Sequence, residues 1–428
     1  MQDYPGSHSR LRLAQFAAIA VSLLVSVAVV AFAAGLLFER NLVREVANPQ
    51  ALEVGSLTTD SPGVLTSPGL SRLDEVTTLI EQEYYLRPDS SEDAEEFWRA
   101  LEESAIRGLT AGLDGHTTYL PPTDSAKAAD SLSGSYEGIG IWINSGDGAI
   151  TVVAPVPGSP AENAGIRSGD VIVAIDGRRT VGMDEKSAVE ALMGPAGEEV
   201  ELSVQRTGGS GELTFSVVRQ RITYPVVKYQ FEADREVAII TVMIFGDRTV
   251  SELDTALARA RQDGAKGIVL DLRNNGGGWV QSAQETIGRF LDPAVGPALY
   301  EDFNGLIDGD EVAEPIIAGD FIDEETPLVV LVNGGSASAS EIVAGALSDY
   351  GRALIVGMPT YGKGSVQRVH EFSDGASLRL TFAQWLTPNL HTIENEGLQP
   401  DLVVEPIDDE SGVDVQLESA INKVVNIE

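Results

Sequence analysis

The chain contains no cysteine and only four histidines. The lack of cysteine excludes disulfides, thiolate metal sites and a cysteine nucleophile. No His-Glu-x-x-His pattern or comparable cluster occurs, so we expect neither a metal nor another cofactor. Positive charge is also scarce, since 29 Lys and Arg stand against 65 Asp and Glu. The resulting net charge of −36 repels nucleic acid and anionic lipid, and we expect neither as an electrostatic partner.

Charged residues are also missing from 14–38, an apolar run long enough to span a bilayer of about 30 Å. Arg10 and Arg12 precede it, which favours an N-inside orientation. The run is longer than the apolar core of a cleaved signal peptide, so we expect an uncleaved signal anchor. The Ala-Phe-Ala sequence at 31–33 keeps cleavage open. In both cases the rest of the chain lies outside the cytoplasm.

A serine-rich turn follows a short apolar run in the last third of the chain. Residues 327–332 read as a buried strand, and 335–341 read Gly-Ser-Ala-Ser-Ala-Ser-Glu. Apolar residues at helical spacing continue from Ile342 towards Gly351. A serine at such a turn lies beside unpaired helix N–H groups that can hold an oxyanion, so the pattern favours a serine nucleophile.

A serine nucleophile needs a base, and no histidine lies in a motif that would supply one; they are His8, His116, His370 and His391. Lysine is the alternative, provided that burial lowers its pKa from about 10.4. Lys363 stands between two glycines, just after the apolar run 354–356, and Gln367 could orient its amine.

Simpler interpretations of both motifs exist. A serine cluster before a helix is commonly an N-cap, and Gly-Lys-Gly is commonly a surface turn. Residues 357–363 also fit the first seven positions of a phosphate-binding loop. That reading fails at the eighth position, where Gly364 offers no hydroxyl for magnesium, and Pro359 removes a backbone donor.

A small β-rich unit is predicted between Tyr136 and Arg221. Its short strand-like runs are punctuated by Gly and Asp turns, and a helix fits 185–193. Residues 136–141 and 159–172 resemble a PDZ domain. Consecutive N–H groups in such a loop capture a terminal carboxylate while the next strand edge pairs with the peptide. The peptide-binding residues would be Gly138, Ile139, Gly140 and Ile141.

Together the serine turn and the Gly-Lys-Gly turn resemble the active-site segment of the carboxyl-terminal processing, or tail-specific, proteases. The resemblance implies Ser338 as nucleophile, Lys363 as base and Gln367 as the residue that orients it.

The resemblance extends from about residue 73 to 404. Residues 267–278, a buried strand and a glycine-rich turn before a helix over 280–291, resemble the segment that supplies an oxyanion amide. This points to Gly277 together with Ala339, although the choice among the three glycines 276–278 stays open. Residues 113–121 resemble the segment that precedes the PDZ domain, and its lone His116 is read as structural rather than catalytic.

The expected architecture is an α/β core like that of the crotonase and Clp-protease folds, with an inserted PDZ domain and an N-terminal transmembrane helix. The predicted units are a cytoplasmic N-terminus (1–13), a signal anchor (14–38), a linker (39–68), a helical region (69–132), the PDZ domain (133–222), the Ser-Lys protease core (223–405) and an acidic tail (406–428).

The expected function is a membrane-anchored serine endopeptidase that acts on proteins or peptides with accessible C-termini. Self-association into a homo-oligomer is left open. The alternative is a PDZ scaffold that keeps the protease fold without activity, and the intact Ser338, Lys363 and Gln367 argue against it.

Overall fold

The computed structural model describes residues 71–427, apart from 87, 89, 146–148, 207–210, 304–310, 320–324 and 408–412. The predicted N-terminus 1–13, signal anchor 14–38 and linker 39–68 lie outside the described residues. No helix in the described part of the chain has the length and apolar character to cross a membrane.

The central sheet has six strands in the order β10-β11-β12-β15-β16-β19. Strand β10 runs antiparallel to β11, and the neighbours from β11 onwards run parallel. The strands are β10 (Val227–Glu232), β11 (Val237–Val242), β12 (Gly267–Asp271), β15 (Leu328–Val332), β16 (Leu354–Gly357) and β19 (Leu402–Val403). Both β12 and β15 are buried along their whole length, as their uninterrupted apolar sequences predict.

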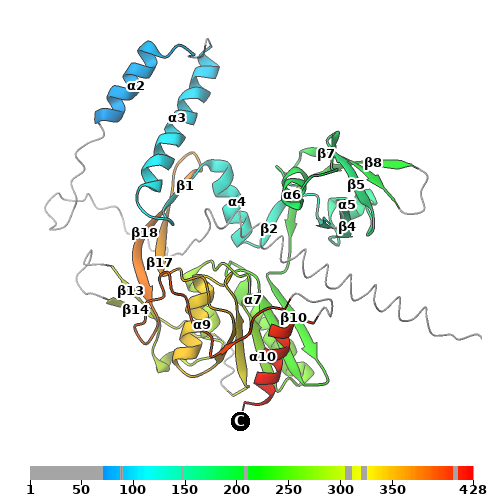
Figure 1. The fold of residues 1–428 in the computed structure, drawn as a ribbon, viewed down its shortest axis with the longest axis vertical. Coiled ribbons are helices and arrows are strands. Elements are labelled where there is room, and N and C mark those ends of the chain that lie inside the picture. The colour runs from blue at the N-terminus through cyan, green and yellow to red at the C-terminus, as the bar shows by residue number, and fades with distance from the viewer. Residues whose placement is uncertain are drawn as a thin grey trace, which may run out of the picture.

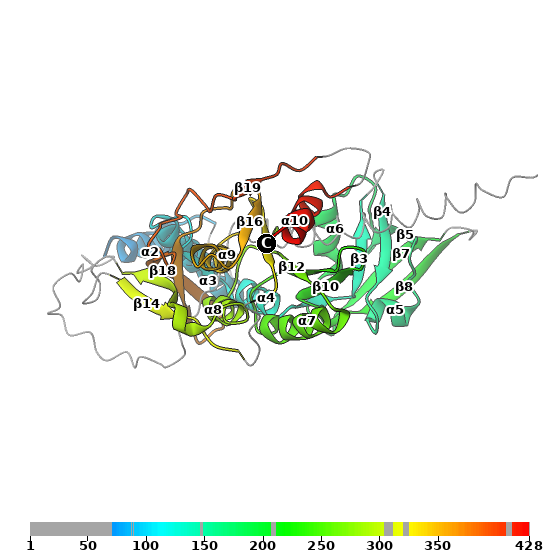
Figure 2. The same ribbon diagram turned by 90° about the horizontal axis from the view of Figure 1, so that it is seen from below.

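Helices cover both faces of this sheet (Figure 2). One face packs against α7 (Thr249–Asp263), α8 (Val280–Ile287) and α9 (Ala339–Asp349), and the other packs against α10 (Val415–Val425). Alternate residues of β11, β12, β15 and β16 enter the two layers, as the period of two along a strand requires. The mixed α/β architecture expected from the sequence is confirmed.

Two expectations differ from the structure. The predicted acidic tail 406–428 contains α10, whose Ala420, Ile421 and Val424 are buried against the sheet. The helix predicted over 280–291 ends at Ile287, and Gly288, its C-cap, packs so closely against the backbone of Ile317 that a side chain there would collide with it. Residues 288–291 continue as hydrogen-bonded turns instead.

A second sheet stands beside the core in the order β1-β18-β13-β14, with β17 also paired to β18. Its strands are β1 (Thr118–Leu120), β13 (Pro297–Asp302), β14 (Glu311–Pro315), β17 (Ser365–Glu371) and β18 (Ser377–Leu386). The long β17 and β18 run from the core towards β1 and the end of α3 (Figure 1). This sheet therefore joins residues on both sides of the predicted PDZ unit.

The described part of the predicted helical region 69–132 consists mainly of three helices and the short strand β1. It forms α2 (Ser71–Glu83), α3 (Ser91–Ala111) and α4 (Pro122–Leu132), and α2 and α3 extend away from the body of the molecule (Figure 1). Helix α3 is preceded by Ser90, whose side chain accepts the N–H of Asp93, as expected for an N-cap.

The β-rich unit has its own sheet in the order β3-β4-β5-β7-β8, and β6 pairs with β5. Its elements are β3 (Ile141–Asn144), β4 (Ile150–Pro155), α5 (Pro160–Ala164), β5 (Val171–Ile175), β6 (Arg178–Arg179), α6 (Glu185–Leu192), β7 (Glu199–Gln205) and β8 (Glu212–Val218). They enclose a hydrophobic core of their own. Strands β2 (Ser135–Gly138) and β9 (Gln220–Thr223) pair with each other where the chain enters and leaves this unit.

Candidate active site

The serine turn lies where β15 ends and α9 begins, and the structure distinguishes its three serines. The Ser336 hydroxyl donates to the Leu272 carbonyl at 2.8 Å, and the Ser340 hydroxyl donates to the Asn275 carbonyl at 2.7 Å. These two serines fasten the turn to the segment after β12. Ser338 occupies the corner between them, with φ of 52° and ψ of −114°.

A positive φ is strained for a residue with a side chain, and such strain is common at functional corners of the backbone. In the α/β-hydrolase enzymes, a sharp and strained strand-to-helix turn likewise presents the nucleophilic serine. Ala339, the first residue of α9, is fully buried, and its N–H is one of the helix N-terminal donors that have no intrahelical acceptor. The predicted nucleophile and one predicted oxyanion donor are therefore adjacent at the helix start.

Gly277 lies directly against this corner. Its φ is 104°, and a Cβ there would lie 2.9 Å from the Ser338 Cβ and 3.0 Å from the Ala339 nitrogen. The structure thus brings Gly277 and Ala339 together, as the sequence predicts. However, the Gly277 N–H donates to the Asn275 Oδ1 at 2.9 Å. That hydrogen bond must break before this amide can bind an oxyanion.

The predicted base is buried. Lys363 lies between β16 and β17, is 4% exposed, and donates from Nζ to the Gln367 Oε1 at 2.7 Å. The indole of Trp385 donates to the Lys363 carbonyl at 3.0 Å and holds this loop against β18. Gln367 therefore contacts the lysine amine as predicted.

One buried carboxylate connects the serine turn to the lysine loop. Glu341 Oε2 accepts the Ser338 N–H at 2.7 Å and the Lys363 N–H at 3.0 Å. Its Oε1 accepts the Thr360 hydroxyl at 2.5 Å and the Gly362 N–H at 2.7 Å. Burial raises the pKa of Glu341 above the ordinary value, although these four donors act in the opposite direction. Both carboxylate oxygens thus serve to fix the distance between two loops.

Two residues that hold the site together, Glu341 and Asn275, are not among the residues predicted from sequence motifs. A carboxylate in the first helical turn, three residues after a serine, has the spacing of a capping box, which could have drawn attention to Glu341. Asn275 is fully buried and its Nδ2 donates to the Val242 carbonyl at 2.9 Å. No local pattern in the sequence indicates that contact.

His116 lies near Lys363, the predicted base. Burial and, next, the charge of Lys363 lower the pKa of His116. Its backbone N–H donates to Asp114 Oδ1 at 2.7 Å. The described structure therefore brings the segment before the PDZ unit, including His116, into the surroundings of Lys363.

The predicted carboxylate-binding loop lies between β2 and β3. Ile139 is 1% exposed and belongs to the core of the small unit, whereas Gly140 has a φ of 76° and accepts the Ser159 hydroxyl at 2.9 Å. Strand β3 is an edge strand, paired with β4 and with no second strand partner among the described residues. Its end is tied to α6, because the Ser145 hydroxyl donates to the Glu185 carboxylate at 3.0 Å.

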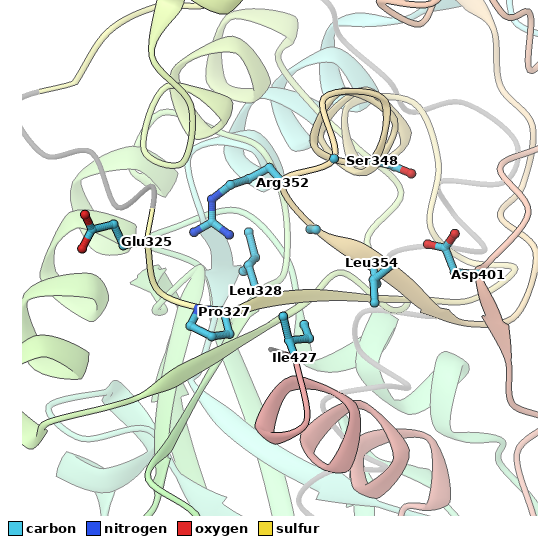
Figure 3. Close-up of a pocket in the computed structure, with 10 residues that line it drawn as sticks. Glu325, Pro327, Leu328, Ser348, Arg352, Leu354, Asp401 and Ile427 are labelled. Carbon is cyan, nitrogen blue, oxygen red and sulfur yellow. The ribbon is translucent and has the colours of Figure 1, made fainter.

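A cavity of about 330 Å³ lies elsewhere (Figure 3). Leu328 and Leu354, the first residues of β15 and β16, line it together with Arg352 and Asp401. Ser338 and Lys363 follow the opposite ends of the same parallel strands. This cavity is therefore separate from the serine and lysine.

Two family models match the chain. The model for peptidase family S41 matches residues 236–404, and a PDZ domain model matches residues 151–206. The chain is 36% identical over 354 residues to a carboxy-terminal-processing protease of Bartonella bacilliformis, covering 81% of this chain and 78% of the relative.

A protein of Staphylococcus aureus named "Probable CtpA-like serine protease" is 35% identical, over 78% of this chain and 65% of its own length. Among solved structures, a photosystem II D1 C-terminal processing protease shares 31% identity and a TM-score of 0.45, covering 82% of this chain and 91% of that one.

Proposed function

The chain belongs to peptidase family S41 and is a serine protease of the carboxy-terminal-processing kind, and from this premise we propose that Ser338 and Lys363 are its catalytic dyad. In this proposal Lys363 Nζ accepts the Ser338 hydroxyl proton as the serine oxygen attacks a peptide carbonyl. The lysine then gives the proton to the leaving amine. Water hydrolyses the acyl-enzyme and restores the serine.

The observation that carries the proposal is the anchoring of both loops by Glu341. Proton transfer requires the serine oxygen and the lysine amine to be held at hydrogen-bond distance. Glu341 accepts N–H groups from Ser338 and Lys363 through the same carboxylate oxygen, at 2.7 and 3.0 Å. The N–H groups of Ala339 and Gly277 are the proposed oxyanion donors.

We further propose that the PDZ domain selects substrates by their free C-terminus. The loop 138–141 would bind the terminal carboxylate, and the open edge of β3 would pair with the peptide. Two observations support this: β3 has no second strand partner among the described residues, and the Ser145–Glu185 hydrogen bond holds its end beside α6.

Amidation of the C-terminus of a good peptide substrate is expected to lower kcat/KM about tenfold, since it removes a charge-assisted hydrogen-bond partner. Mass spectrometry of the fragments from matched free-acid and amidated peptides measures both the rate and the cleavage site. Gly140→Ala should erase the difference, because a Cβ there would collide with Ser159 and φ is positive. Equal cleavage of both peptides by the unaltered protein would contradict the proposal that the PDZ domain binds the terminal carboxylate. It would not contradict the proposed dyad.

The apolar run 14–38 supports a membrane anchor, with the protease outside the cytoplasm. The full chain is then expected to remain in the membrane fraction after alkaline carbonate extraction, and a chain lacking 14–38 should become extractable. If alkaline carbonate released the full chain into the supernatant, the membrane anchor would be ruled out.

A further inference from the structure

The segment before the PDZ domain reaches the surroundings of the base through β1. Thr118 of β1 pairs with Arg379 of β18, and the Thr381 N–H donates to the Thr117 hydroxyl oxygen at 3.1 Å. Asp114 holds the turn before β1, because its carboxylate accepts the His116 N–H at 2.7 Å and the Thr117 hydroxyl at 2.6 Å. The turn therefore presents a carboxylate beside β18.

A chain of hydrogen bonds runs from this carboxylate to the base. The Thr381 hydroxyl donates to Asp114 Oδ1 at 3.3 Å and accepts from Gln367 Nε2 at 3.3 Å. Gln367 Oε1 then accepts from Lys363 Nζ at 2.7 Å. The two longer contacts exceed the usual distance and contribute little energy. Their value lies in the direction that they impose.

An ionised carboxylate only accepts hydrogen bonds, so it fixes which way the Thr381 hydroxyl points. Partial burial raises the pKa of Asp114, but hydrogen bonds from Thr117, His116 and Thr381 outweigh burial and hold this pKa below its usual value. The Thr381 oxygen is then left to accept from the glutamine amide. Ser365, the other acceptor of Gln367 Nε2 at 2.9 Å, fixes no direction alone, because its hydroxyl can rotate to donate or accept.

The orientation of the Gln367 amide decides whether the lysine can act. With Oε1 facing the lysine, a neutral amine donates one N–H and keeps its lone pair for the Ser338 proton. With the amide reversed, Nε2 would donate into that lone pair and block the base. The two orientations have nearly the same shape, so packing alone discriminates poorly between them.

We propose that Asp114 and Thr381 are positioning residues that hold the Gln367 amide with its oxygen towards Lys363. The inference rests on the proposed Ser-Lys dyad. Asp114, which precedes the PDZ domain in the chain, would thus help to keep the Lys363 amine able to accept a proton. In the proposed reaction Asp114 contacts neither the serine nor the substrate carbonyl.

Thr381→Val tests this, since it removes the hydroxyl and keeps the shape. We expect kcat to fall about tenfold with KM unchanged. The acid limb of the kcat profile should also move to lower pH, because loss of the Oε1 acceptor disfavours the charged lysine. His116, Glu341 and Glu394, the other titratable groups around the lysine loop, are unaltered by the substitution.

Thr381→Ser keeps the hydroxyl and should restore both kcat and the pH midpoint. Asp114→Asn provides a second route to the same defect, with the same direction of change. Thr387→Val is the matched control: it removes another buried hydroxyl, which accepts the His391 N–H at 3.4 Å, and should leave the profile in place.

A Thr381→Val enzyme with unaltered kcat and pH midpoint overturns the inference, and so does a rise in KM alone. Ser338→Ala, assayed in parallel, separates this failure from that of the proposed function. Loss of cleavage in Ser338→Ala with a normal Thr381→Val keeps the dyad and rejects the positioning role. Cleavage by Ser338→Ala rejects both.

Discussion

Ser338→Ala is expected to lower kcat for peptide cleavage by about 10⁴-fold or more while the protein stays folded, because no other hydroxyl occupies the strained corner before α9. Lys363→Ala should lose as much, and the double variant should lose no more, since a nucleophile without its base is nearly inert. Lys363→Arg should be equally inactive, because a guanidinium cannot be deprotonated in proteins.

Steady-state kinetics on a quenched peptide, with circular dichroism to verify folding, measure these effects. Two controls lie outside the site. Ser348 is on α9 beside the distant cavity, and Lys266 is an exposed lysine paired with Glu236. Ser348→Ala should retain turnover because Ser348 lies away from the proposed dyad. Lys266→Ala should retain it because an exposed ion pair contributes little stability. Near-normal turnover by folded Lys363→Ala would show that the dyad is wrong.

Glu341→Gln is expected to lower kcat at least about 100-fold, because misplacement of reacting groups by about 1 Å has effects of that size. An amide can accept through its oxygen only, so its NH₂ group would face two of the four donors that the carboxylate now satisfies. Unsatisfied buried donors cost about 1–3 kcal/mol each, so we expect the free energy of unfolding to fall by roughly 2–6 kcal/mol.

Glu394→Gln is the matched control, since Glu394 accepts a single N–H of the same loop, from Gly364, at 2.7 Å in a partly buried position. Thr360→Val removes one of the donors to Glu341 and should give an intermediate loss. Denaturant unfolding and kcat measured on each protein provide the comparison. If Glu341→Gln kept both stability and turnover at the level of Glu394→Gln, Glu341 would not hold the two loops together.

The sequence predicted those parts of the site that lie in short contiguous motifs. Local spacing indicates the serine turn, the Gly-Lys-Gly turn and Gln367. Alternating apolar residues indicate the strands of the PDZ unit. Helix α10 carried a usable signal, because Ala420, Ile421 and Val424 have helical spacing, but the surrounding acidic composition favoured a tail.

The parts that escaped prediction depend on contacts between distant segments. Glu341 acquires its role only when the lysine loop reaches α9, and Asp114 contacts Thr381 across 267 positions of the chain. The engagement of the Gly277 amide by Asn275 likewise depends on the folded turn. Neither hydrophobic periodicity nor local propensity predicts such long-range contacts, since each depends on how the sheets pack.

Asp114, in the turn before β1, contacts Thr381 of β18, which lies 267 positions later, so the ribosome must add that length before β1 can join the second sheet. At about 5–20 residues per second, this interval lasts roughly 10 to 50 s. The PDZ strands all lie between β1 and β18 and are complete early in that time, so they can fold first. The strands of the PDZ unit end at Val218, so this unit can be folded before Lys363, the proposed base, and β18 have been made.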